Sequence, residues 1–438
     1  TNLDVVDIDG AVDMASTLGV TGLVTGTKIL INSASGDGLK VSATDQANAR
    51  ITIDNLNGQA WQLVAGTAGA SNSGFGIYDS DAGATRLQIA SDGSLSTPTL
   101  GTSNVRFGVN AGNSIASGGN LNTVIGDEAG TAITTGDENT FVGYQSGDGT
   151  TTAIRNTAIG AYSLGDNTTG ANNVAVGRQA LKYNTTASNN TALGYNALQV
   201  NTTGTSNVAV GALALDANTT ASNNTAVGYQ SLGANTTGAG NVAMGYLALS
   251  TGITSANSVA VGYEALANTT VNGNHAFGFR ALKANTTGSS NTALGSNALA
   301  ANTTGASNVA VGSGSLDANT TANNNTAVGN SAGGSVTTGI NNTLIGSLAG
   351  DALTEAGYNV ALGYQALSGD TLGARSVAIG TQALISQNFT SATNAYNVAV
   401  GYSAGGQVTT GVQNTLIGGL AGDALTTANA NTALGYSS

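Results

Sequence analysis

A five-residue phrase, Asn-Thr/Val-Ala-apolar-Gly, recurs through about three quarters of this 438-residue chain and constrains its fold more than any other feature. Its glycine falls at twenty positions, and sixteen of the nineteen intervals are seventeen residues, the others being 18, 16 and 21. The residue before the glycine is apolar in every copy. Stacked structural units keep such a register, whereas disordered chains do not. The period therefore predicts a solenoid.

The repeat phrase has the alternation of a β-strand. In Asn207–Gly211, Val208 and Val210 share one face, while Ala209 and Gly211 share the other. We expect each coil to hold a strand over the phrase, a bend at the glycine and a second short extended piece ending in Ala-Leu. The structural repeat glycines include Gly143, Gly160, Gly177, Gly194, Gly211, Gly228, Gly245 and Gly262. The fold class predicted is all-β, a parallel β-solenoid (β-roll) of about twenty coils.

The contents of such a coil are limited by its length. Seventeen residues at roughly 3.3 Å each give a contour of about 56 Å, which folds into a flattened loop. We expect one layer of Val, Ile and Leu inside and Ala and Gly on the outer face. Small outward residues let another chain approach closely, so we expect several chains to pack around one axis.

A second motif, Asn-Thr-Thr, follows many of the phrases. We place it in the return turn, where Asn tolerates left-handed backbone geometry and identical side chains stack from coil to coil. The triplets also match the acceptor for N-linked glycans, although turn geometry explains their regular spacing. They begin at Asn167, Asn184, Asn201, Asn218, Asn235, Asn268, Asn285, Asn302 and Asn319.

Composition and charge argue against most chemistry. Charged residues make up 8% of the chain, its formal charge is -12, and it contains no cysteine. Nucleic acid is therefore an unsuitable partner, because phosphate recognition needs clustered Lys and Arg. The sequence contains no run of 18 apolar residues, so it does not predict a membrane-spanning helix.

The few chemically reactive side chains form no convincing catalytic or metal-binding set. His275 replaces Thr or Val within one repeat phrase, and Asp79 and Asp81 lie in a turn-rich segment. The aspartates around Gly10 lack the bidentate Glu of a calcium loop. We expect no enzyme activity, no metal and no cofactor.

The phrase Asn-Thr/Val-Ala-Val/Ile/Leu-Gly-x-x-Ala/Ser-Leu resembles the repeats in the heads of trimeric autotransporter adhesins of the YadA type and those in bacteriophage tail fibres. The resemblance covers residues 104–438 and implies a homotrimer of left-handed β-rolls. The adhesin unit is nearer fourteen residues, so the extra residues of each coil depart from its pattern.

The first hundred residues resemble the small β-domains and Gly/Thr-rich collars of phage tail fibres. Short alternating strands are expected at residues 28–31, 50–54, 60–64, 75–78 and 86–89. The domains expected are a β-rich collar or stalk over 1–40, a small β-domain over 41–103 and the repeat shaft over 104–438.

Two features are candidates for surface contact. Tyrosine often follows the repeat glycine, as at Tyr195, Tyr229, Tyr246 and Tyr263. Such a column could stack on sugars or simply cover the roll. Four extra residues lie between Gly380 and Gly401, in a segment carrying Phe389 and Tyr396, and insertions in solenoids commonly emerge as binding loops.

These observations predict a structural, adhesive fibre. The leading interpretation is a homotrimeric phage tail fibre, located in the virion tail and extracellular, that binds a host-surface carbohydrate or protein receptor and contacts other tail proteins through its N-terminal part. The alternatives are a polymerising cell-surface filament, a monomeric ice-binding solenoid and, last, an enzyme. Resemblance to fibres with a self-cleaving C-terminal chaperone marks Ser438 as a candidate processed end; a boundary of this piece of sequence is the other interpretation.

Overall fold

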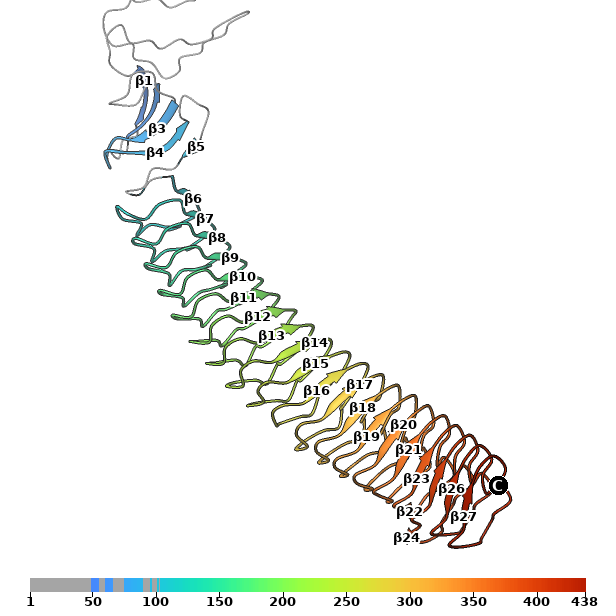
Figure 1. The fold of residues 1–438 in the computed structure, drawn as a ribbon. Helices are drawn as coiled ribbons and strands as arrows, with labels where there is room; N and C mark the ends of the chain where they lie inside the picture. Colours follow the sequence, from blue (N-terminus) through green and yellow to red (C-terminus); the bar gives the residue numbers. More distant parts are fainter. Residues whose placement is uncertain (1–48, 55–59, 66–74, 90–94, 97–100, 102) are drawn as a thin grey trace, which may run out of the picture. The chain divides into compact units, whose positions relative to one another are not determined.

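A computed structural model describes residues 49–54, 60–65, 75–89, 95–96, 101 and 103–438 (Figure 1). The chain separates into two compact units, Thr1–Leu95 and Ser96–Ser438. The collar expected over residues 1–40, with its strand at 28–31, lies outside the described residues. So do the aspartates around Gly10.

The first unit contains a five-stranded sheet whose strands follow one another in chain order. The first four pair antiparallel, which confirms the four strands expected after residue 49. The strands are β1 (Ala49–Asp54), β2 (Ala60–Ala65), β3 (Phe75–Asp79), β4 (Ala84–Ile89) and β5 (Leu95–Ser96).

The second unit is the expected parallel β-solenoid. Each coil contributes one three-residue strand to a single ladder, from β6 to β27 (Figure 1). The strands of the ladder are β6 (Val105–Phe107), β7 (Thr123–Ile125), β8 (Thr140–Val142), β9 (Thr157–Ile159), β10 (Val174–Val176), β11 (Thr191–Leu193), β12 (Val208–Val210), β13 (Thr225–Val227), β14 (Val242–Met244), β15 (Val259–Val261), β16 (His275–Phe277), β17 (Thr292–Leu294), β18 (Val309–Val311), β19 (Thr326–Val328), β20 (Thr343–Ile345), β21 (Val360–Leu362), β23 (Val377–Ile379), β25 (Val398–Val400), β26 (Thr415–Ile417) and β27 (Thr432–Leu434).

The ladder keeps one register from end to end. Ala175 of β10 faces Ala192 of β11, and equivalent residues face each other at every later step. The register survives all three irregular intervals: β6 on β7, β15 on β16, and β23 on β25. The coils therefore take up extra or missing residues away from the strands.

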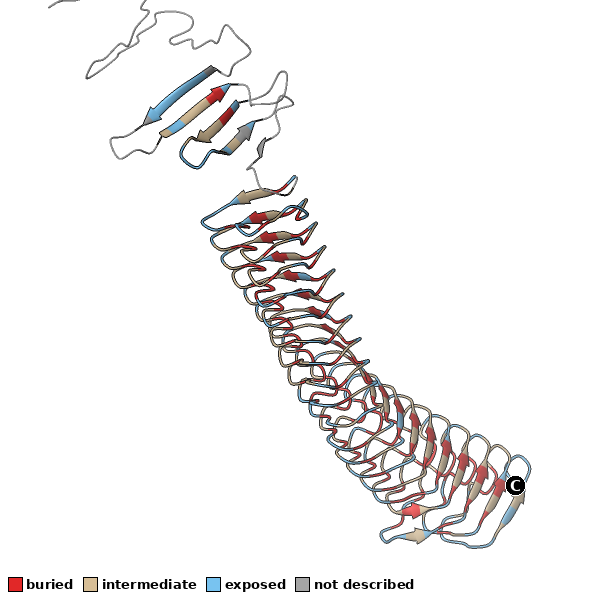
Figure 2. Ribbon diagram, turned by 90° about the vertical axis from the view of Figure 1, so that its left-hand side faces the viewer, coloured by how far each residue is buried: buried red, intermediate tan, exposed pale blue. Residues whose placement is uncertain are grey.

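The two faces of the ladder are opposite to the expectation. The middle residue of the strand points into the coil, so that Ala209 is 0% exposed, while Val208 and Val210 on either side of it point outward. Figure 2 shows the strand centres as a buried line along the solenoid. The alternation of residues along the strand does not by itself determine which face points into the coil. The narrow coil decides it, because leucines from another part of each coil already fill the interior.

Those leucines lie four residues after the repeat glycine, in a run of turns. The second extended piece expected there is wrong. Leu181, for example, has a left-handed backbone (φ 52°), is fully buried, and donates its backbone N–H to Ala197 O of the next coil at 3.0 Å. In some coils glycine replaces this leucine, and the middle residue of the strand is larger than alanine. A Cβ on Gly147 would lie 2.6 Å from the Phe141 ring, so the two positions exchange volume.

The repeat glycines stack directly on one another. Gly228 has φ 133°, a conformation open essentially only to glycine, and a Cβ on it would lie 2.5 Å from Gly245 O of the next coil. The structural role expected for these glycines has this physical basis. Each coil needs glycine for its own bend and for the approach of its neighbour.

Two columns of buried asparagine side chains run along the solenoid, each coil adding one residue to a column over many successive coils. In the Asn-Thr-Thr column, Asn201 Nδ2 donates to Asn184 Oδ1 at 3.0 Å and to Gly204 O at 2.9 Å. At the start of the strand, Asn207 N–H donates to Asn190 Oδ1 at 2.9 Å. This confirms the stacking of identical side chains in the return turn. Eight of the nine triplet asparagines are buried and Asn268 is exposed, so the folded protein hides the other eight from glycosylation.

The longest coil contains a small extra sheet. Its strand β24 (Thr393–Asn394) pairs in parallel with β22 (Gly373–Ala374) of the preceding coil. Beneath it, buried Asp370 accepts a hydrogen bond from Gln387 Nε2 at 2.6 Å and one from the backbone of Gly373 at 2.9 Å. These contacts fix the inserted segment against the solenoid.

Candidate binding surfaces

The most extensive candidate surface is the outward side of the ladder, formed by the first and third residues of each solenoid strand. We call it the strand face. Its third residues are Val, Ile, Leu, Met or Phe, and its first residues are Val or Thr, with His275 once. No Asp, Glu, Lys or Arg occupies either position in the twenty strands. Leu193, at 46%, is one of the more exposed residues on this uncharged face, and most of the others are half-buried.

The dimensions of the strand face exceed those of an ordinary surface patch. Nineteen steps of about 4.8 Å give a length of roughly 90 Å, and two side-chain columns with their flanks give a width of about 10 Å. The product, roughly 900 Å², is larger than the 300–600 Å² patch of a typical monomer. It matches the roughly 800 Å² that one partner buries in a stable complex.

The tyrosine column lies next to this face, because tyrosine follows the repeat glycine in eight of the twenty coils. Tyr229, Tyr246, Tyr263 and Phe279 form a continuous stack, with ring centroids 5.1–5.6 Å apart and interplanar angles of 13–17°. Within the stack, each ring covers the face of its neighbour, so edges and hydroxyl groups remain for a ligand. The arrangement favours covering the roll over stacking on sugars. Tyr195 lies outside this stack, with the Arg178 guanidinium 5.9 Å from its centroid.

The inserted coil places its two aromatic candidates differently. Phe389 is 5% exposed, and its ring would lie 2.7 Å from a Cβ on Gly373 of β22. It is therefore buried and is not the surface contact that the sequence predicted. Tyr396, in contrast, is 51% exposed. Only the second candidate remains available to a ligand.

Beside Tyr396 lies an arginine that sequence reasoning missed. The Arg375 guanidinium is 4.7 Å from the Tyr358 ring centroid and 6.0 Å from that of Tyr396. Its Nε donates to Asn394 Oδ1 of β24 at 3.0 Å. The three side chains belong to consecutive coils, each one residue before the start of a coil's phrase. Aligning the coils would have revealed this Tyr-Arg-Tyr column.

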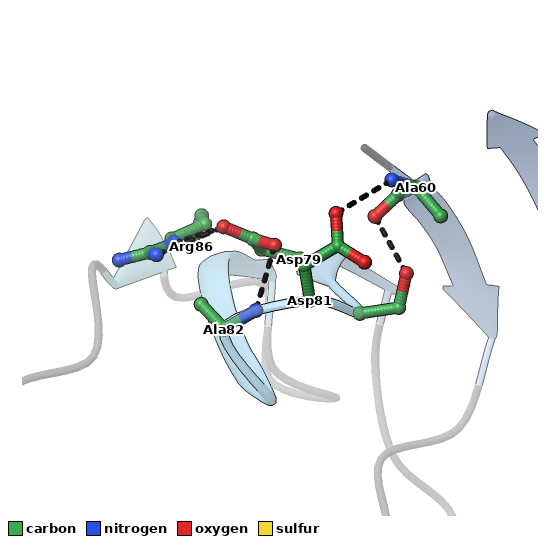
Figure 3. Close-up of polar contacts among 6 residues, drawn as sticks. Ala60, Asp79, Asp81, Ala82 and Arg86 are labelled. Atoms are coloured by element: carbon green, nitrogen blue, oxygen red, sulfur yellow. Dashed lines mark hydrogen bonds and ion pairs between the residues drawn. The ribbon is translucent and has the colours of Figure 1, made fainter. Parts of the chain in front are cut away.

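The paired aspartates of the first unit serve a turn. Asp79 accepts from Ala82 N at 3.1 Å and from Arg86 Nη2 at 2.9 Å, while Asp81 accepts from Ala60 N at 3.0 Å (Figure 3). The Ala82 hydrogen bond, and then Arg86, hold the pKa of Asp79 below its usual value. Asp79 is held within the β3–β4 hairpin and Asp81 by the start of β2, which explains both residues structurally.

Two solenoid carboxyl groups have altered acidity because of burial. Burial raises the pKa of Asp148 to about 6; the charge of Asp166 adds to this and backbone hydrogen bonds oppose it. Burial also raises the pKa of Asp370, while the hydrogen bond from Gln387 acts in the opposite direction. Within the described residues, no three His, Asp or Glu side chains gather at one point.

The remaining predicted residues lie on the solenoid. His275 is an outward residue of the ladder, between Val259 and Thr292, as expected for a substitution within the repeat. The carbonyl of Ser438 accepts from Gly422 N at 2.9 Å. The first threonine of each triplet has a hydrogen-bond partner as well; Thr202 Oγ1, for example, donates to Thr219 O at 3.0 Å.

Within the described part of the chain, no helix has the length and apolarity needed to cross a bilayer. Comparison of the whole sequence with family models, curated proteins and solved structures finds no match.

Proposed function

We propose that this chain is the structural shaft of an adhesive fibre, a homotrimer that attaches a bacteriophage to surface glycans or proteins of its host. The observation that carries the proposal is the strand face, which is about 90 Å long, mostly apolar and free of Asp, Glu, Lys and Arg. A soluble protein seldom leaves such a face in water, so three copies packed side by side would cover it.

Three features support a mechanical role. The in-register backbone ladder and the asparagine columns cross-link each coil to the next, which stiffens the shaft. The repeat resembles those of trimeric adhesin heads and phage fibres. A trimer also presents every surface site three times, so weak individual contacts add up through avidity. The face proposed as the interface differs from our sequence expectation, because β-branched and larger apolar residues, and not Ala and Gly, point outward.

The test is the native mass of the full chain, measured by light scattering without denaturant. We expect three times the chain mass of 42.6 kDa. Charging the strand face with Leu193→Glu and Met244→Glu should reduce the mass to that of one chain, because burying carboxylates without partners is costly. Thr220→Glu, on an exposed turn away from the strands, is the matched control and should remain trimeric.

A single-chain mass for the unmodified protein would overturn the proposal. Much larger and heterogeneous masses would favour the alternative, a polymerising cell-surface filament. If the double substitution left a trimer intact, the strand face would not be the interface.

A further inference from the structure

We infer that the cluster of Tyr358, Arg375 and Tyr396, here called the arginine cluster, binds the carboxylate of an acidic saccharide. The inference deepens the proposed attachment function and rests on it, since it gives that function a ligand class. It starts from a charge imbalance. In a chain of formal charge -12, Arg375 is exposed and has no carboxylate partner among the described residues.

The position of the guanidinium is fixed on three sides. Tyr358 and Tyr396 lie on either side of it, at 4.7 and 6.0 Å from the ring centroids. Its Nε is held by Asn394 Oδ1 at 3.0 Å, and Asn394 belongs to the extra strand of the inserted coil. Among the described residues, neither terminal nitrogen of Arg375 has a hydrogen-bond partner in the protein. A planar guanidinium already held in place loses less entropy on binding and can form a fork with a carboxylate.

The arginine at the equivalent position of another coil has a carboxylate partner, whereas Arg375 has none among the residues that the structure describes. Arg155 occupies the same place in its coil, also with a left-handed backbone (φ 58°, against 65° for Arg375). Its Nε is 2.8 Å from Glu138 Oε2, so its charge is neutralised within the protein. Arg375 has two tyrosine rings where Arg155 has an acid. The coil position alone therefore does not dictate an ion pair.

The flanking rings favour a sugar acid as the ligand. Tyr358 and Tyr396 are each about half exposed and each offers an apolar ring and a hydroxyl group. A pyranose ring has matching apolar C–H and polar O–H surfaces, and a sugar acid adds the carboxylate that Arg375 would bind. The tyrosines have the combination of apolar body and polar tip that suits such mixed surfaces.

The test is calorimetric titration of the full chain with two carboxylate saccharides, trigalacturonic acid and sialyllactose, and with their methyl esters. We expect at least one acid to bind about tenfold or more tightly than its ester, as a charge-assisted hydrogen-bonded pair predicts. Arg375→Asn should weaken binding of the acid to a similar extent. Asparagine occupies this left-handed position in other coils, for example Asn341 (φ 56°), so the variant should fold.

Arg155→Asn is the matched control and should bind like the unmodified chain. The inference is overturned if neither acid binds, if acid and ester bind equally, or if Arg375→Asn has no effect. Tighter binding of triglutamate than of either saccharide, with the same dependence on Arg375, would assign the site to an acidic peptide instead. The native mass of each variant is measured in parallel. A trimer without acid-dependent binding refutes only this inference, whereas a single-chain mass refutes the proposed fibre.

Discussion

Replacing one repeat glycine in the middle of the ladder should destabilise the solenoid strongly. In Gly228→Ala, the backbone would have to keep φ 133° or bend the coil away from the next one. The added Cβ would lie 2.5 Å from Gly245 O and 2.7 Å from Gly245 C, where ordinary contact begins near 3.4 Å. A non-glycine residue in such a conformation costs about 1–3 kcal/mol, and overpacking adds about 1–3 kcal/mol. The expected loss is therefore about 2–6 kcal/mol of unfolding free energy.

The loss can be measured by urea unfolding followed by circular dichroism, with the midpoint and slope compared between variants. The control is Gly273→Asn, because Gly273 also has positive φ (71°) but a Cβ there meets nothing within 4 Å. We expect the control to stay within about 0.5 kcal/mol of the parent. A loss below about 1 kcal/mol for Gly228→Ala, with the ladder intact, would refute the argument that glycine stacking limits the spacing of the coils.

Three further predictions concern buried polar groups. The Oδ1 atom of Asn235 is buried without a hydrogen-bond partner, because the next coil has Gly252 in place of Asn. Gly252→Asn, combined with Ser255→Ala to remove the hydroxyl oxygen that lies 2.8 Å from the new Cβ, should raise the free energy of unfolding by about 1 kcal/mol; a lower midpoint of thermal unfolding would contradict this. The pKa of Asp148 is raised to about 6, so the folded protein binds this proton more tightly than the unfolded chain, and the contribution of Asp148 to stability should increase as the pH falls from 7 towards 4. Asp148→Asn should reduce that increase by about 1 kcal/mol after allowance for solvent screening; an unchanged dependence of stability on pH would contradict this prediction. Gln387→Ala removes a donor to Asp370 and should destabilise the protein by about 2 kcal/mol near neutral pH. Because burial raises the pKa of Asp370, this loss should shrink as the pH falls and the carboxyl group takes up a proton; a loss that does not change with pH would contradict the argument.

The sequence predicted the repeat register well, because the strand phrase and its glycine carry it directly. It did not predict which face of the strand is inside. Val208 and Ala209 alternate in either arrangement, and the choice depends on what else fills the coil. The decisive residue is the leucine four positions after the glycine, whose left-handed backbone is contrary to its intrinsic preference. Glycine at the same position in a few coils, such as Gly147, was the available signal.

The candidate site was predictable only in part. The insertion indicated the right region, but Phe389 and Tyr396 look equivalent in the sequence and differ in burial. Burial depends on the small sheet of β22 and β24, which joins residues twenty positions apart. Arg375 lies outside the inserted segment altogether. Its relation to Tyr358 and Tyr396 appears only when consecutive coils are laid over one another.

The constancy of the ladder across irregular coils has a consequence for how such a shaft can change in length. β15 pairs with β16 across a coil of sixteen residues, and β23 pairs with β25 across a coil of twenty-one, both in the same register. The strand pairing therefore does not depend on the length of the rest of the coil. Gain or loss of one whole repeat then lengthens or shortens the shaft by about 4.8 Å and joins surfaces that already fit. The length of the shaft can thus change in small equal steps, while the sequences of its turns vary independently.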